Sequence, residues 1–575
     1  MTDLAAARSR IAEVYRAYAD SAPDFLRTAA ALHLAVGVGF GVLAAFLLWP
    51  ITGGDYPPGV DTPTFLHLSW IADLAITGNL TDPLEDPFWY GGFFYLVYPP
   101  LSYGLVGLTT AITPASLAHV YASVLILAYG AFGFSVWFLS REFGLRWRAA
   151  ALAGVFTLLA YPSLNSVFLW GWFTTVVSLP FALLSVAFLE RSFQRRSKRA
   201  ALAAGVLMAL ATLAHHMTGL SIVMGLTLWI AFRLARERES RRELFVSCLI
   251  AAVTTLILIS PWAIAFLITT ADTGFRREIP GNWLVPLGTY TTSILDPGLV
   301  GEFVYPSYLG IVLTAFALLG GFLSFIEGNR LASVTLILAV LLWFSLGANA
   351  NPLINHYPLS GLDVARFHIF MTPFMALLAA SAVERSIAAL AQGSRRFQSP
   401  SSWGITVAIA ISLVLAYPAY TALQARGLAE PYRVETQVRQ ALDWIEDNSP
   451  NDAAAPSSVY AVGFWNWQAF LVPALTGQRI VDGWHDEGAD NVRSIRKLRD
   501  MAWPPGGPVD AEIMHEILLD LDGRFVMLYR AYWQGERVDE HWEKLEERPD
   551  LFKHRQTWGD IGIFEVLAAS DERKD

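Results

Sequence analysis

Long runs of apolar residues occupy most of the first 420 positions, and short polar segments separate them. A transmembrane helix needs about 20 mainly apolar residues, and eleven stretches approach that length. They lie near residues 31–50, 117–140, 149–165, 172–190, 200–216, 219–235, 244–270, 306–326, 331–347, 364–388 and 403–422. The pattern predicts a mainly α-helical, polytopic transmembrane bundle of about eleven spans. It leaves open whether the turn at Gly171 and Trp172, between two short runs, leaves the membrane.

Basic residues gather in alternate connections between these runs. They are Arg8, Arg10, Arg16 and Arg27; Arg141, Arg146 and Arg148; Arg191, Arg195, Arg196, Lys198 and Arg199; Arg233, Arg236, Arg238, Arg241 and Arg242; Arg330; and Arg385, Arg395 and Arg396. Cytoplasmic loops carry an excess of Lys and Arg. The charges therefore predict a cytoplasmic segment at 1–30 and a transmembrane domain at 31–424. Because no small-residue cleavage site follows the run Leu32–Trp49, we expect a signal anchor.

An odd number of spans places residues 425–575 outside the cell, in a stretch as long as one ordinary domain. Apolar residues recur at helical spacing from Val434 to Ile445. Ser458–Phe464, Arg524–Tyr529 and Asp560–Leu567 have the composition of strands. We expect a soluble extracytoplasmic α/β domain there.

Composition agrees with a membrane protein and excludes several classes. Of the 575 residues, 54% are hydrophobic and 16% are charged, against roughly 25% charged in soluble domains. The net charge of −9 gives no sign of nucleic-acid binding. Cys248 is the one cysteine, so no intramolecular disulfide can form. The chain also lacks phosphate-binding and hydrolase motifs in a credible context.

The first outer loop, residues 51–116, carries the most candidate chemistry. Asp61 lies about eleven residues after the first span, near the membrane interface. Its carboxylate could accept a proton from a hydroxyl or help to hold a divalent cation such as Mg²⁺ or Mn²⁺. Alternatively, Asp61 is a turn or N-cap residue before a helix at 64–77. His67 follows by six residues, a spacing that does not put it on the face of Asp61.

An acidic and aromatic run comes next in the same loop. Glu85 and Asp86 adjoin Trp89 and Tyr90. Carboxylates and aromatic rings together suit a sugar site. The same pattern is equally consistent with a solvated loop that interfacial aromatic residues anchor.

Ionisable residues at membrane depth supply further candidates. His215 and His216 end the run at 200–216, where they could bind substrate or be simple helix-end histidines; on a helix they would point about 100° apart. Arg366 opens the run at 364–388, with His368 close by. Its guanidinium suits a lipid phosphate, although a snorkelling Arg or a pair with Asp363 would also explain it.

Two weaker substrate-binding candidates lie between these runs. Arg276, with its neighbour Arg277, breaks the charge pattern of the outer loops, and Glu302 precedes the run at 306–326.

These segments resemble the GT-C superfamily of membrane glycosyltransferases, which have a cytoplasmic N-terminus, a long first outer loop with an early acidic residue, and eleven to thirteen spans. More narrowly, local motifs are similar to the prokaryotic membrane family labelled 6-pyruvoyl-tetrahydropterin synthase-related, a label without implication of pterin chemistry. The motifs are Gly59-Val60-Asp61 with His67, Phe88-Trp89-Tyr90-Gly91-Gly92, Tyr98-Pro99-Pro100-Leu101, Leu213-Ala214-His215-His216 and Ala365-Arg366-Phe367.

The resemblance implies that Asp61 is the catalytic or metal-coordinating acid and that Arg366 binds the phosphate of the donor. It also implies a sugar donor on a polyprenyl phosphate, a glycan, lipid or protein acceptor, and membrane lipids as partners. In the C-terminal part, Trp465-Asn466-Trp467 resembles a motif of the oligosaccharyltransferase catalytic subunit, with Asn where that family has Asp. The sequence thus predicts a membrane glycosyltransferase. The alternative is a non-catalytic carrier or scaffold for lipid-linked glycans.

Overall fold

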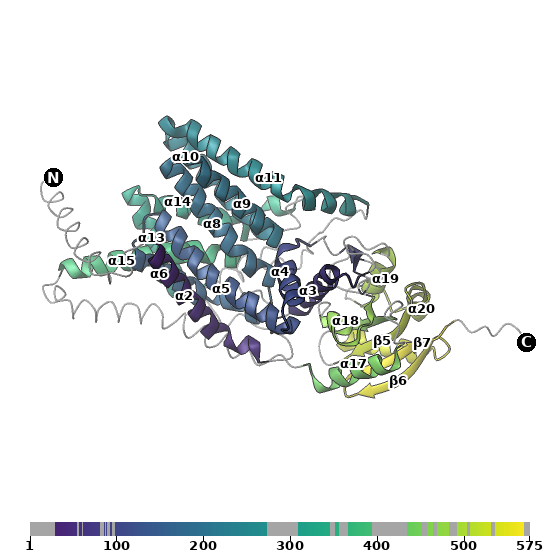
Figure 1. The fold of residues 1–575 in the computed structure, drawn as a ribbon. Coiled ribbons are helices and arrows are strands. Elements are labelled where there is room, and N and C mark those ends of the chain that lie inside the picture. The colour runs from purple at the N-terminus through teal and green to yellow at the C-terminus, as the bar shows by residue number, and fades with distance from the viewer. Residues whose placement is uncertain are drawn as a thin grey trace, which may run out of the picture.

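The computed structural model describes most of the chain, and it is mainly helical with one sheet domain beside a helical bundle (Figure 1). The described residues are 29–53, 57–59, 61–80, 85–86, 88, 93–94, 98–272, 309–345, 351–355, 366–393, 434–449, 457–463, 468–481, 492–502, 506–530 and 535–568. Several sequence predictions fall outside them. These are Trp89, Tyr90, Arg276, Glu302, the run at 403–422 and the side chain of Glu85.

The bundle follows the apolar runs of the sequence. Its helices are α2 (Ala29–Leu48), α5 (Leu117–Glu142), α6 (Trp147–Leu159), α7 (Tyr161–Phe168), α8 (Phe173–Arg195), α9 (Lys198–Ala214), α10 (His216–Arg236), α11 (Arg241–Asp272), α13 (Ile311–Glu327), α14 (Leu331–Ser345) and α15 (Phe367–Gly393). Short 3-10 helices are η2 (Trp49–Thr52), η4 (Arg238–Ser240), η7 (Pro352–Asn355) and η11 (Gln468–Phe470).

Within the described residues, six helices are long and apolar enough to cross a membrane: α2, α5, α8, α10, α11 and α15. Helices α6 and α7 are bent by 42° and make a seventh span if the pair is counted as one. Helices α9, α13 and α14 are apolar but shorter, with 15 to 17 residues each. The count of eleven spans therefore stays a prediction.

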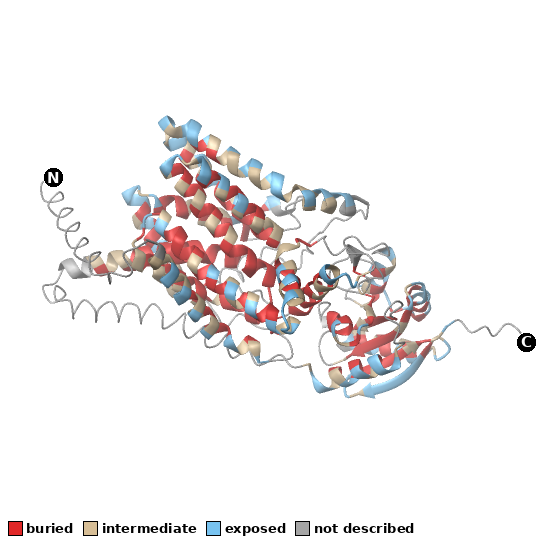
Figure 2. Ribbon diagram, in the orientation of Figure 1, coloured by how far each residue is buried: buried red, intermediate tan, exposed pale blue. Residues whose placement is uncertain are grey.

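Burial separates the centre of the bundle from its periphery. In α15, 94% of the most apolar stretch is buried, and in α8 83%, whereas α11 buries 11% of its stretch (Figure 2). A helix that is apolar all round and buried belongs to the centre of such a bundle. The exposed apolar residues of α2 and α11 suit contact with lipid tails.

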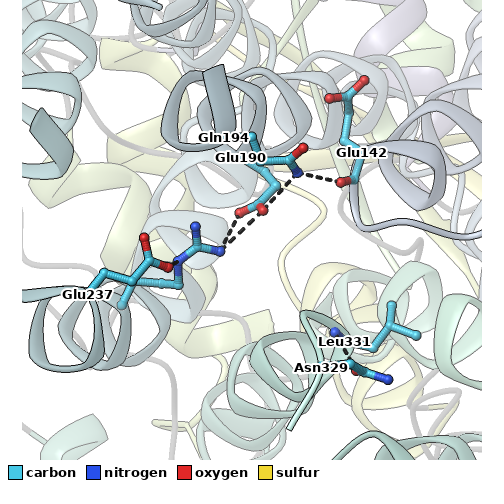
Figure 3. Close-up of polar contacts among 7 residues, drawn as sticks. Glu142, Glu190, Gln194, Glu237, Asn329 and Leu331 are labelled. Carbon is cyan, nitrogen blue, oxygen red and sulfur yellow. Dashed lines mark hydrogen bonds and ion pairs between the residues drawn. The ribbon is translucent and has the colours of Figure 1, made fainter. Parts of the chain in front are cut away.

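The basic connections between α8 and α9 and between α10 and α11 lie at the end of the bundle away from the sheet domain (Figure 1). There the completely buried Glu190 of α8 accepts hydrogen bonds from Arg233 of α10 at 3.0 and 3.2 Å, and Arg233 also pairs with Glu237 (Figure 3). Gln194 links Glu190 to the backbone of Glu142. Pairing and hydrogen bonds offset the cost of burying these charges, and the network ties α5, α8 and α10 together.

The first outer loop folds into α3 (Thr62–Thr77) and α4 (Leu101–Ile112), with a small hairpin of β1 (Glu85–Asp86) and β2 (Phe93–Phe94). The loop joins the bundle to the sheet domain. The backbone N–H of Ile480 donates to the carbonyl of Phe88 at 2.9 Å. The ring of His67 on α3 lies 5.2 Å from the ring of Phe470.

The C-terminal part contains a five-stranded mixed sheet in the order β4-β3-β5-β7-β6. Its elements are α17 (Thr436–Asn448), β3 (Ser458–Val462), α18 (Leu471–Thr476), β4 (Arg479–Ile480), α19 (Val492–Ala502), α20 (Ala511–Asp520), β5 (Gly523–Tyr529), α21 (Gly535–Glu546), β6 (Phe552–Trp558) and β7 (Ile561–Val566). Strand β3 pairs in parallel with β4 and β5, whereas β7 pairs antiparallel with β5 and β6.

Strand β5 shows how this sheet is buried on both faces. Phe525 and Met527 share a core with α17 and α18, whereas Val526 and Leu528 share one with α20 and α21. Alternate residues of a strand point to opposite faces, so β5 is apolar from Phe525 to Tyr529. Strands β3, β5 and β7 coincide with the three strands expected from the sequence, while β4 and β6 were not expected. Strand β6 is mostly exposed along its length, and β4 has two residues, so neither has an apolar pattern.

A buried histidine makes the stability of this domain depend on pH. His541 on α21 is completely buried, and its Nδ1–H donates to the carbonyl of Arg537. Burial lowers the pKa of His541 to about 4. This pKa lies below the ordinary value of about 6.5. The stability that the neutral His541 contributes to the folded state is therefore complete above pH 6.5, and it is lost as the pH falls towards 4.

We expect acidification from pH 7 to 5 to reduce the free energy of unfolding by about 2 kcal/mol through His541. Thermal unfolding of the full chain in detergent measures this, and His541→Gln should flatten the pH dependence. Replacing the exposed His554 by Gln serves as the control. Equal pH dependence in all three proteins would contradict the assignment.

Candidate active site

Arg366 lies immediately before α15, and its guanidinium has partners on several sides. Nη1 donates to Thr175 Oγ1 at 3.0 Å and lies 3.2 Å from His215 Nε2. The guanidinium carbon lies 4.8 Å from the ring centre of Trp172, a distance typical of cation–π contact. Nη2 approaches Asp61 Oδ2 at 3.4 Å. Residues from three separate segments thus converge on one cation.

His215 has a defined tautomer in this group. Arginine only donates hydrogen bonds, so Nε2 of His215 must accept from Arg366. Nδ1 is then the protonated nitrogen, and it lies 2.8 Å from Thr218 Oγ1 and 3.3 Å from Thr175 Oγ1. His215 is buried and neutral in this arrangement.

The backbone at His215 corrects one expectation. The sequence suggested two adjacent histidines on a helix, but His215 has φ −162° and ψ 105° and connects α9 to α10. The extended residue turns its ring towards Arg366, and the ring of His216 faces Tyr98, Trp262 and Phe266 instead. His368, the second residue of α15, is buried too.

Asp61 occupies the N-cap position of α3, yet its side chain makes no capping hydrogen bond. Asp61 thus has the N-cap position that the alternative explanation gave it, but its side chain makes no capping bond. Its carboxylate pairs with Arg366 and keeps 14% of its surface exposed, against 9% for the arginine side chain. A carboxylate that is not needed to cap the helix, and that solvent can still reach, is suited to proton transfer.

Two glycines position Asp61 against the turn between α7 and α8. A Cβ on Gly59 would lie 2.4 Å from the Cα of Gly171, and a Cβ on Gly171 would lie 2.5 Å from Thr62 Oγ1. Both residues have positive φ, +115° and +63°, which only glycine adopts at no cost. This close approach, the glycine crossing, lets the N–H of Asp61 donate to the carbonyl of Trp170 at 2.9 Å.

The remaining predicted residues of the outer loop form a separate contact. His67 Nε2 and Asp86 Oδ2 are 2.5 Å apart, and both side chains are completely buried. Asp86 Oδ1 also accepts from the N–H of Phe88. These bonds hold the loop on α3 beside the sheet domain. Direct contact of His67 and Asp86 with substrate stays a prediction.

Sequence patterns did not indicate several members of the site. Thr175 and Thr218 lie in apolar runs where a hydroxyl usually bonds to its own helix, and Trp172 looked like part of a turn. Only the glycine-aromatic turn at Gly171 stood out, as a soft point in the span count. Among the described parts of the chain, no three His, Cys, Asp or Glu side chains gather as a metal site. The divalent cation stays a prediction.

The fold is similar to that of several solved structures. An oligosaccharyltransferase from Archaeoglobus fulgidus matches 88% of this chain over 70% of its own length, with a TM-score of 0.59 and 16% identity. The arabinofuranosyltransferase AftD from mycobacteria matches 93% over 40% of its length, with a TM-score of 0.57 and 13% identity. ArnT from Cupriavidus metallidurans matches 92% over 98%, with a TM-score of 0.53 and 14% identity.

The chain belongs to the 6-pyruvoyl-tetrahydropterin synthase related family of membrane proteins, whose profile matches residues 95–424. The matched range contains Thr175, His215 and Arg366, while Asp61 and the sheet domain lie outside it. A sequence comparison with curated proteins finds no match.

Proposed function

We propose that this protein is a membrane glycosyltransferase that moves a sugar from a polyprenyl-phosphate carrier to a hydroxyl of a lipid, glycan or protein on the outer face. The observation that carries the proposal is the pairing of Asp61, at the start of α3, with Arg366, at the start of α15. A base and a phosphate-binding cation within reach of each other are the two groups such a transfer needs.

In the proposed reaction, the acceptor hydroxyl attacks the anomeric carbon of the donor sugar. Its proton passes to the carboxylate of Asp61 as the new C–O bond forms. The bond between the anomeric carbon and the phosphate oxygen breaks, and Arg366 stabilises the negative charge of the leaving phosphate. His215 and Thr175 keep the guanidinium in place through neutral contacts.

The fold of the three glycosyltransferases supports the enzyme proposal, and the charge pattern supports the sidedness. The basic connections between α8 and α9 and between α10 and α11 lie at the end of the bundle away from the sheet domain, whereas α3 lies beside that domain (Figure 1). Asp61 immediately precedes α3 and pairs with Arg366. With the basic end in the cytoplasm, both residues and the sheet domain face outward, where donor sugars on a polyprenyl carrier would be used.

A deletion strain tests the proposal in cells. We expect one polyprenyl-linked sugar to accumulate and one surface glycan to lose that sugar, as measured by mass spectrometry of extracted lipids and glycans. The wild-type gene should restore both. Unchanged lipid-linked and surface glycans would overturn the proposal.

A carrier or scaffold can be distinguished from an enzyme in detergent micelles, which have no two sides to transport between. The purified enzyme should convert polyprenyl-linked sugars from the deletion strain into a glycosylated product when acceptor extract is added. A carrier would form no product under the same conditions.

A further inference from the structure

The guanidinium of Arg366 makes two shorter contacts through Nη1 and a longer one through Nη2. Nη1 contacts Thr175 and His215 at 3.0 and 3.2 Å, and both partners are neutral. Nη2 faces Asp61 across 3.4 Å, which is long for a charge-assisted hydrogen bond of usually 2.7–2.9 Å. The neutral contacts orient the cation without neutralising its charge, so Asp61 acts as its counterion.

The surroundings allow the carboxylate of Asp61 to move away from Nη2 while the guanidinium of Arg366 keeps its position. The backbone of Asp61 is fixed by its bond to Trp170 and by the glycine crossing. Its side chain does not cap α3, remains partly exposed and meets Arg366 at 3.4 Å. Rotation of the carboxylate therefore needs no movement of the helix, whereas Arg366 is secured by Trp172, Thr175 and His215.

We propose that Asp61 and the donor phosphate compete for Nη2 of Arg366, so that donor binding releases Asp61 and must precede activation of the acceptor. This inference rests on the proposed function and adds an order of binding to it. A phosphate offers more negative charge and more acceptor oxygens than a carboxylate, and guanidinium groups bind it in a two-point geometry. Without donor, the base is occupied by its own counterion.

The exchange makes a prediction about binding alone. Removing the charge of Asp61 should tighten the binding of a polyprenyl phosphate, because the competing anion is gone. We expect Asp61→Asn to lower the Kd of farnesyl phosphate by about three- to tenfold, and Arg366→Gln to raise it by about tenfold or more. In the double variant, the gain from Asp61→Asn should disappear, because no guanidinium is left to compete for.

Binding is followed by tryptophan fluorescence of the full chain in micelles with a chelator, so that no divalent cation bridges Asp61 and phosphate. Farnesol, which lacks the phosphate, is the matched ligand and should bind all variants equally. Arg366→Lys is measured as well, because it keeps the positive charge if Arg366→Gln fails to fold. It should bind with intermediate affinity.

The outcomes distinguish the exchange at Nη2 from the phosphate-binding role of Arg366. If Asp61→Asn binds farnesyl phosphate as wild type does, or more weakly, while the Arg366 variants bind less well, the exchange is wrong and the donor site stands. If neither Arg366 variant weakens binding, the phosphate role of Arg366 is wrong, and the exchange falls with it.

Discussion

Replacing Asp61 by Asn should slow sugar transfer by about 10²- to 10⁴-fold, the usual contribution of a general base. The carboxamide keeps the shape of the side chain, and its oxygen can still accept a hydrogen bond from Arg366. It cannot accept the proton of the acceptor hydroxyl. The side chain does not cap α3, so we expect the thermal unfolding temperature to change little. Initial rates in micelles, with saturating donor extract, measure the effect.

A second aspartate on the same helix provides the control. Asp73 lies in α3 and is partly exposed, so Asp73→Asn should transfer sugar at the wild-type rate. If Asp61→Asn retains a rate within threefold of wild type, Asp61 is not the base, and the proposed mechanism must be abandoned.

Gly171→Ala should have a comparably large effect on transfer without touching a catalytic group. At φ +63° a non-glycine residue costs about 1–2 kcal/mol, and the new Cβ would meet Thr62 at 2.5–2.9 Å. The turn must move away from Asp61 and Arg366 to relieve this overlap. Since a misplacement of about 1 Å can cost about 10²-fold in rate, we expect a loss of that order.

Substitutions at two further glycines distinguish displacement of the turn beside Asp61 from backbone strain and from a general loss of packing. Gly78 also has a positive φ, +76°, but open space surrounds it. Gly78→Ala therefore tests the backbone strain without the overlap. Gly205→Ala meets the carbonyl of Ala251 at 2.6 Å, between α9 and α11. We expect both to lose stability and keep the rate per folded molecule. If either loses as much activity as Gly171→Ala, the effect of Gly171 is a general loss of packing and does not report on Asp61.

The candidate site shows how far residue patterns reach. Asp61 and Arg366 stood out because charged residues are rare near apolar runs and because Arg366 broke the charge pattern. Their ion pair spans 305 positions of sequence, and no local pattern encodes such a distance. Thr175 and His215 are 40 residues apart and meet on the same guanidinium, so only the packing of α8 against α9 and α10 reveals them.

His67 and Asp86 illustrate the opposite case. An acidic and aromatic loop looked suited to sugars, yet the two side chains bond to each other at 2.5 Å in a buried contact. A carboxylate beside an imidazole has the same composition whether it binds a ligand or fastens a loop. Burial decides between these uses, and burial depends on where the sheet domain packs.

The sequence by itself determined the apolar helices, the alternation of basic connections and three of the five strands in the C-terminal sheet, because hydrophobic periodicity and charge act over a few residues. It also indicated Asp61 and Arg366 as candidates. Only the tertiary structure decided that they form a pair, that His215 and Thr175 hold one edge of the guanidinium, and that two glycines cross to place Asp61 there. These contacts depend on close approach between distant segments, which is set by how the helices pack.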